Sequence, residues 1–172
     1  MKGNEKIYGN DEPSVVQVVQ TMETYKQSNV KVINIEDFED YRVASLIIDD
    51  FFIASALFKK NSNGNYNLEN FQVGNHWGNQ SNVHIFKLNP IRMYHLVFTE
   101  EHEVAHLEIQ VNKIKGEPVK LTPKKESFYY FKLDDIDPNE EELYEWKFIF
   151  FNKEEKLLKM EEGDYWIYMD GK

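Results

Sequence analysis

The sequence predicts an α+β protein: an N-terminal helix on an antiparallel four-stranded β-meander, followed by a mostly antiparallel half that resembles a β-sandwich. Three observations predict this fold class. Helical periodicity is convincing only in residues 12–27, and the most apolar run is residues 41–60, reading YRVASLIIDDFFIASALFKK. After residue 82, strand-like segments recur at spacings of roughly ten residues, which is typical of sandwiches.

The first predicted element is a helix in residues 12–27. Asp11 is the expected N-cap, Pro13 suits the first turn, and residues 28–29 end the helix. Apolar side chains recur there at the spacing of one helix face: Val15, Val18, Val19, Met22 and Tyr25.

The apolar run supplies a central hairpin, preceded by a strand at residues 30–35 and followed by one at residues 66–73. Its arms, residues 43–48 and 51–58, are joined at Asp49-Asp50, whose carboxylates can accept hydrogen bonds from their own turn. Because the arms alternate little, we expect both faces of the hairpin to be covered. The side chains expected to be buried are Leu46, Ile48, Phe52, Ala54 and Leu57.

The second half is predicted to be all β. Four segments are expected: a polar leader (1–11), the helix and meander (12–73), a loop (74–82, GNHWGNQSN) and a sandwich-like half packed against the first (83–172). The expected strands of the second half are residues 83–88, 93–99, 104–111, 119–122, 127–133, 144–151, 156–160 and 165–169.

Composition argues against several classes of function. The net charge of −10 makes binding to nucleic acid or to an anionic membrane surface unfavourable. The absence of cysteine excludes disulfides, thiolate catalysis and Cys-ligated zinc. The sequence contains no apolar run long enough to span a bilayer, so we expect no membrane insertion of this chain, and no cofactor.

The strongest motif is His102-Glu103-Val104-Ala105-His106, which matches the H-E-x-x-H pattern of zinc hydrolases. That chemistry requires a helix, whereas the apolar residues from Ala105 to Val111 alternate with polar ones, as in a strand. On a strand the two imidazoles would be about 13 Å apart, too far to share one ion. We therefore expect no zinc here, with a zinc-dependent hydrolase using His102, Glu103 and His106 as the alternative.

Three other patterns have a functional and a structural interpretation. His84, His95 and His106 could share a metal if neighbouring strands brought them together, but single strand histidines are more often hydrogen-bonded. Residues 134–142 contain six carboxylates and lack the glycine of an EF-hand, so a solvated loop is favoured over a weak cation site. The aromatic row of residues 144–150 favours a core over a ligand platform.

The candidate contact residues are Trp77 and its neighbour His76. Their Gly/Asn-rich surroundings predict an exposed loop tip, where a large aromatic side chain has no core to fill.

The layout, ending in YEWKFIFFNKEEKLL, resembles small extracytoplasmic, lipoprotein-type domains of Gram-positive bacteria. That resemblance implies a location outside the cytoplasm, with a lipid anchor in the full-length precursor, and a cytoplasmic location is the alternative. We expect a non-enzymatic binding or interaction module with an unknown protein or small ligand as its partner. The alternatives are the zinc-dependent hydrolase and an acidic inhibitor or immunity-type protein.

Overall fold

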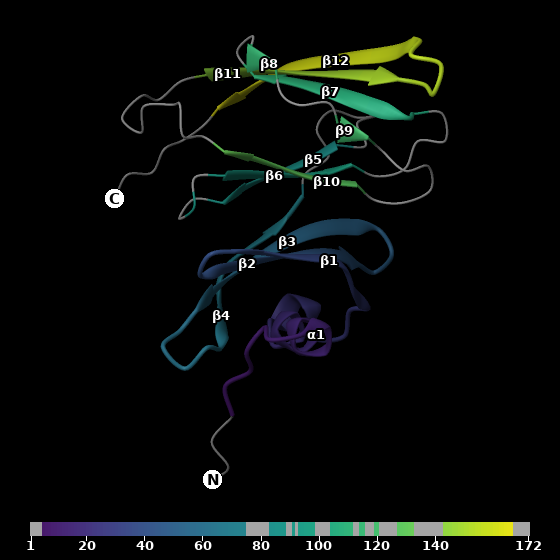
Figure 1. Ribbon diagram of the computed structural model, residues 1–172. Helices are drawn as coiled ribbons and strands as arrows, with labels where there is room; N and C mark the ends of the chain where they lie inside the picture. The colour runs from purple at the N-terminus through teal and green to yellow at the C-terminus, as the bar shows by residue number, and fades with distance from the viewer. Residues whose placement is uncertain are drawn as a thin grey trace. The chain divides into compact units, whose positions relative to one another are not determined.

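The computed structural model describes residues 5–74, 83–88, 91, 93–98, 104–111, 114–115, 119–120, 127–132 and 143–166. The chain divides into two compact units (Figure 1). The first contains α1 to β4 and most of β5 (Val83–Leu88), and the second contains β6 to β12. No helix within the described ranges is long and apolar enough to cross a membrane.

The first unit is built on the predicted antiparallel meander, with strand order β1-β2-β3-β4. The strands are β1 (Val30–Phe38), β2 (Tyr41–Ile48), β3 (Phe52–Lys60) and β4 (Tyr66–Val73). Asp49 and Asp50 both have positive φ, at 53° and 57°, and Phe51 N donates to Ile48 O at 3.1 Å, so they form the tight turn of the central hairpin. The Asp49 carboxylate accepts from Asn29 N (2.8 Å) and Ser28 Oγ (3.0 Å) instead of from its own turn.

The helix is shorter than predicted. α1 covers Glu12–Gln20, and a 3₁₀ turn, η1 (Glu23–Tyr25), follows it. Asp11 caps α1 as predicted, because its Oδ1 accepts from Ser14 N (2.9 Å) while Ser14 Oγ accepts from Asp11 N (3.0 Å). The α-helix ends where Met22 becomes extended (ψ 130°).

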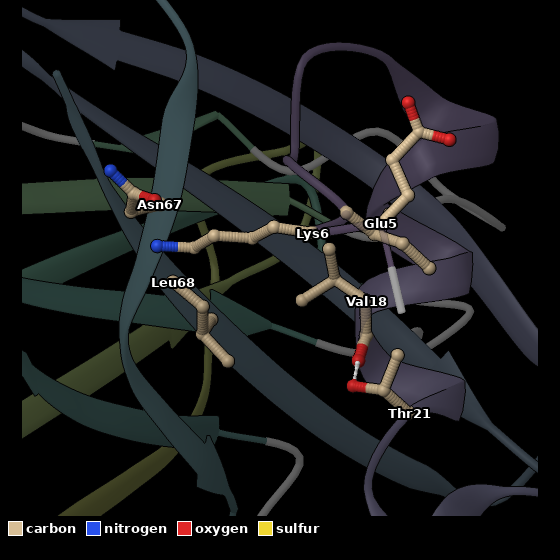
Figure 2. Close-up of a pocket in the computed structure, with 7 residues that line it drawn as sticks. Glu5, Lys6, Val18, Thr21, Asn67 and Leu68 are labelled. Carbon is tan, nitrogen blue, oxygen red and sulfur yellow. Dashed lines mark hydrogen bonds between the residues drawn. The ribbon is translucent and has the colours of Figure 1, made fainter. Parts of the chain in front are cut away.

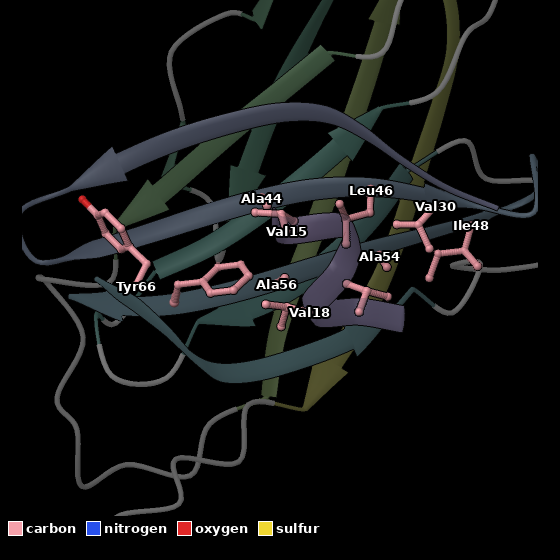
Figure 3. Close-up of a cluster of buried hydrophobic side chains, with 11 residues drawn as sticks. Val15, Val18, Val30, Ala44, Leu46, Ile48, Ala54, Ala56 and Tyr66 are labelled. Carbon is pink, nitrogen blue, oxygen red and sulfur yellow. The ribbon is translucent and has the colours of Figure 1, made fainter. Parts of the chain in front are cut away.

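One face of α1 packs on the sheet and forms the core of the first unit (Figure 3). Three alanines in the middle of β2 and β3 present short side chains to the helix, which lets the helix lie close to the sheet. The buried cluster contains Val15, Val18, Val19, Val30, Ala44, Leu46, Ile48, Ala54, Ala56, Phe58 and Tyr66.

The predicted core is confirmed for four residues and wrong for one. Leu46, Ile48, Ala54 and Leu57 are at most 1% exposed, but Phe52 is 46% exposed. Phe52 is the first residue of β3, directly after the hairpin turn, at the end of the sheet, and its ring meets that of Phe51 edge-on at 5.0 Å. On the opposite face of the hairpin Val43, Ser45, Ile53 and Ser55 are also buried, so both faces are covered as expected.

The second unit is antiparallel β throughout its described residues. β6 (Met93–Phe98) pairs with β10 (Ser127–Lys132), and β11 (Leu143–Phe151) pairs with β12 (Leu157–Trp166) on one side and β7 (His106–Val111) on the other. Two short strands, β8 (Ile114–Lys115) and β9 (Val119–Lys120), also pair with β7.

Two separate strands were expected at residues 156–160 and 165–169, but β12 runs without a break from Leu157 to Trp166, so the expected break between them is wrong. The segment Glu161 to Asp164, whose charge and glycine suggest a turn, instead pairs residue by residue with β11, including Gly163 opposite Trp146. The broad α+β class, mostly antiparallel, is confirmed.

Candidate functional site

Most of the site residues predicted from the sequence lie outside the described residues. This holds for Trp77 and His76, for His102 and Glu103, and for the acidic loop at residues 134–142. Those interpretations stay predictions. The described candidates are His84, His95 and His106, and the buried aromatics Phe148 and Phe150, whose burial fits a core role.

His106 begins a strand, as its alternating pattern predicts. β7 pairs with β11 from His106 opposite Phe151 onward, and Ala105 N donates to Phe151 O at 2.8 Å. The His106 ring stacks on Phe151 at 4.5 Å, with its Nε2 3.3 Å from Glu155 Oε2. The part of the H-E-x-x-H motif from residue 104 onward is therefore not helical.

His84 and His95 are both buried. The His95 ring lies parallel to that of Tyr130, with 4.8 Å between centroids. Among the described residues, no three or more His, Cys, Asp or Glu side chains are grouped to hold a metal ion.

Burial lowers the pKa of His95 to about 3, because a charged imidazolium would lose its hydration there. An unfolded histidine titrates near about 6.5, so between these values the unfolded state binds more protons than the folded state. The free energy of unfolding should therefore fall as the pH drops from about 6.5 toward 3, by up to about 1.4 kcal/mol per pH unit. Urea unfolding of the wild type and of His95→Gln at pH 5 and 7.5 measures this. If the free energy of unfolding differs between the two pH values by as much in the variant as in the wild type, the prediction is contradicted.

A groove of about 600 Å³ lies in the first unit, between the N-terminal segment (residues 5–10), α1 and β4 (Figure 2). Figure 2 shows the Lys6 side chain reaching from the N-terminal segment toward β4. The lining is mixed, with Ile7, Val18 and Leu68 as its apolar part and Glu5, Lys6, Thr21 and Asn67 as its polar part.

Two of the polar groups in the groove differ in their hydrogen bonding. The Thr21 hydroxyl donates to Val18 O at 2.6 Å, so its proton is engaged within α1. The side-chain oxygen Oδ1 of Asn67 is buried and accepts no hydrogen bond from the described part of the chain. A buried acceptor left unpaired costs about 1–3 kcal/mol, so this oxygen is the unsatisfied group of the groove.

The N-terminal segment is fixed to β4 at one point. Gly9 N donates to Tyr66 O (2.8 Å), and Tyr66 N donates to the Asn10 side chain (3.0 Å). Arg42 Nη1 donates to the carbonyl oxygens of Gly9 (3.1 Å) and Asn10 (2.7 Å). Residues 9 and 10, part of the expected leader, therefore belong to the fold, whereas residues 5–8 make no described hydrogen bond to β4.

Arg42 is held in place for this role. Its Nε and Nη2 donate to the two oxygens of Asp37 at 2.7 and 2.9 Å, and its guanidinium lies 4.0 Å from the centre of the Tyr66 ring. The hydrogen bond from Arg42 keeps the pKa of the Asp37 carboxyl below its ordinary value. This pair, with Tyr66, holds residues 9 and 10 against the start of β4.

The outer edge of β4 forms one side of the groove. β4 is an edge strand, and Asn61 N donates to Asn65 O (2.8 Å) where its hairpin with β3 closes. In a strand the main-chain N–H and C=O groups of successive residues point to alternate edges. Those of Tyr66 and Leu68 therefore point away from β3, whereas those of Asn67 point toward Lys59 of β3. The N-terminal segment occupies the outward groups of Tyr66 but not those of Leu68.

Sequence reasoning missed this groove. Comparison of the chain with protein-family models, with curated proteins and with solved structures found no match.

Proposed function

We propose that the chain is a non-enzymatic binding module and that its ligand occupies the groove between the N-terminal segment, α1 and β4. The unpaired, buried Oδ1 of Asn67 carries this proposal. Folded proteins rarely leave such an acceptor unsatisfied, and a donor group on a bound ligand would satisfy it once the Asn67 side chain turns this buried oxygen into the groove.

The composition of the groove supports binding over catalysis. Ligand sites combine an apolar wall with a few polar groups that set orientation, and a volume of about 600 Å³ lies within their usual range. The hydroxyl in the lining belongs to Thr21, and its proton is donated to the main chain. A nucleophile needs a neighbouring base to accept that proton, so Thr21 is poorly suited to such a role.

We make two further proposals, one about the second unit and one about location. We propose that the two sheets of the second unit pack face to face as a sandwich, supported by the burial of Leu96, Leu107, Ile109 and Phe148. We also propose that the protein acts outside the cytoplasm, on the resemblance of its layout to extracytoplasmic domains.

The binding proposal is tested by NMR shift mapping of the ¹⁵N-labelled protein against a library of small fragments and short peptides. We expect hits to move the amide signals of Val18, Thr21 and Leu68. Asn67→Ala should weaken these hits while leaving the free energy of unfolding equal or about 1 kcal/mol higher, since the variant removes an unsatisfied acceptor.

Asn70→Ala is the matched control, because Asn70 is an exposed residue of the same strand. It should leave binding unchanged. Hits that all map away from the groove, or hits indifferent to Asn67→Ala, would refute the proposal.

A further inference from the structure

We propose that the ligand is a peptide in extended conformation, which adds to the outer edge of β4 as a further strand of the sheet. This inference rests on the proposed binding function and names the class of ligand. It follows from main-chain groups along β4, which only a ligand with matching main-chain groups can satisfy in series.

The outward groups continue along β4 beyond Leu68. The register with β3 shifts by one residue between Leu57 and Phe58, which makes Glu69 an extra, bulged residue. After this bulge the alternation turns Phe71 and Val73 outward, whereas Gln72 faces Ser55. No residue in the described part of the chain donates to or accepts from the outward main-chain groups of Leu68, Phe71 or Val73.

The N-terminal segment shows how a strand would begin there. It binds the N–H and C=O of Tyr66 through Asn10 and Gly9, and it then leaves the edge. The space between the diverging segment and β4 is the groove, and it starts at the next outward residue, Leu68. An added peptide would continue the pairing that the N-terminal segment starts.

Side chains around Leu68 define what the peptide carries. Ile7, Val18 and Leu68 offer an apolar wall for one apolar side chain. Asn67 Oδ1 is an unpaired acceptor, so once its side chain turns toward the groove it favours a donor on the peptide. The net charge of −10 favours a neutral or basic peptide over an acidic one.

The other edge of this sheet, β1, is less suited to pairing. Its register shifts between Val32 and Asn34, and it carries the charged side chains of Lys31 and Glu36. Bulges and charges are common means by which edge strands avoid pairing with other chains. β4 also carries a bulge, but it follows Leu68, so the stretch beside the groove remains regular.

The probe is a peptide selected on the protein from a displayed library of random linear peptides. On binding, we expect amide exchange at Leu68 to slow by at least about tenfold, because its N–H gains an acceptor. Two N-methylated versions of the peptide test the pairing, one methylated at the odd-numbered residues and one at the even-numbered residues. One should bind at least about tenfold more weakly and the other nearly as well as the parent peptide, because only one set of amides faces β4.

Ile7→Asp tests the apolar wall without disturbing the core, since Ile7 is 39% exposed. Ile7→Asp should lower the affinity for the selected peptide by at least about tenfold. Leu157→Asp, at a similarly exposed leucine of β12, should leave that affinity unchanged. If small fragments bind in the groove but no selected peptide does, the strand addition is overturned and the proposed binding function stands. Peptides that protect β1 amides instead would overturn the assignment to β4, and an empty groove against both libraries would overturn both proposals.

Discussion

Replacing Leu46 by alanine is expected to lower the free energy of unfolding by about 2–5 kcal/mol. Leu46 is fully buried in the middle of β2, facing α1. Its partners across the sheet are Val32 on β1 and Ala54 on β3. Because the short side chain of Ala54 cannot extend into the space that Leu46 leaves, the cavity should persist and its cost should add to the lost burial.

Urea unfolding of Leu46→Ala measures this loss, with Leu157→Ala as its control. Leu157 is 49% exposed, so its truncation should change stability by less than about 0.5 kcal/mol. A loss below about 1 kcal/mol for Leu46→Ala would remove the claim that the hairpin of β2 and β3 is the centre of the first unit.

Gly9→Ala is expected to have the second largest effect, lowering the free energy of unfolding by about 1–3 kcal/mol. A Cβ at this position would clash with Cε1 of the Phe58 ring, well inside van der Waals contact. Phe58 is fully buried, so its ring has no free space into which to turn. The N-terminal segment must therefore shift, which would also weaken its bonds to Tyr66 and Arg42.

A double-mutant cycle with Phe58→Leu separates the clash from other causes. Leucine lacks the ring that meets residue 9, so Gly9→Ala should cost clearly less in the Phe58→Leu background than in the wild type. If Gly9→Ala lowers the free energy of unfolding equally in both backgrounds, the close approach of Gly9 to the Phe58 ring is not what makes alanine unfavourable at position 9.

The first unit was predictable from local pattern because its elements are defined by short-range signals. The helix face from Val15 to Val19, the N-cap Asp11 and the strand at residues 66–73 each follow from neighbours in the sequence. Errors arose where tertiary pairing overrides such signals. Gly163 suggests a turn but pairs with Trp146, and Phe52 is apolar but lies at the end of the sheet.

The groove could not be predicted because long-range contacts create it. Arg42 reaches back to Gly9 and Asn10, more than thirty residues earlier, and Tyr66 binds the same two residues. No periodicity in residues 5–10 signals these bonds. The polar residues of the groove, such as Asn67 and Thr21, also have no motif spacing, so only the fold brings them together.

Amide hydrogen exchange along β4 in the free protein tests the central claim most directly, because that claim requires an open edge beside the groove. We expect slow exchange at Tyr66, which donates to Asn10, and at Asn67 and Gln72, which face β3. Leu68, Phe71 and Val73 should exchange at least about tenfold faster, and adding the selected peptide should slow Leu68. Protection of Leu68 equal to that of Asn67 in the free protein would mean that its outward N–H is already paired, and would contradict the account.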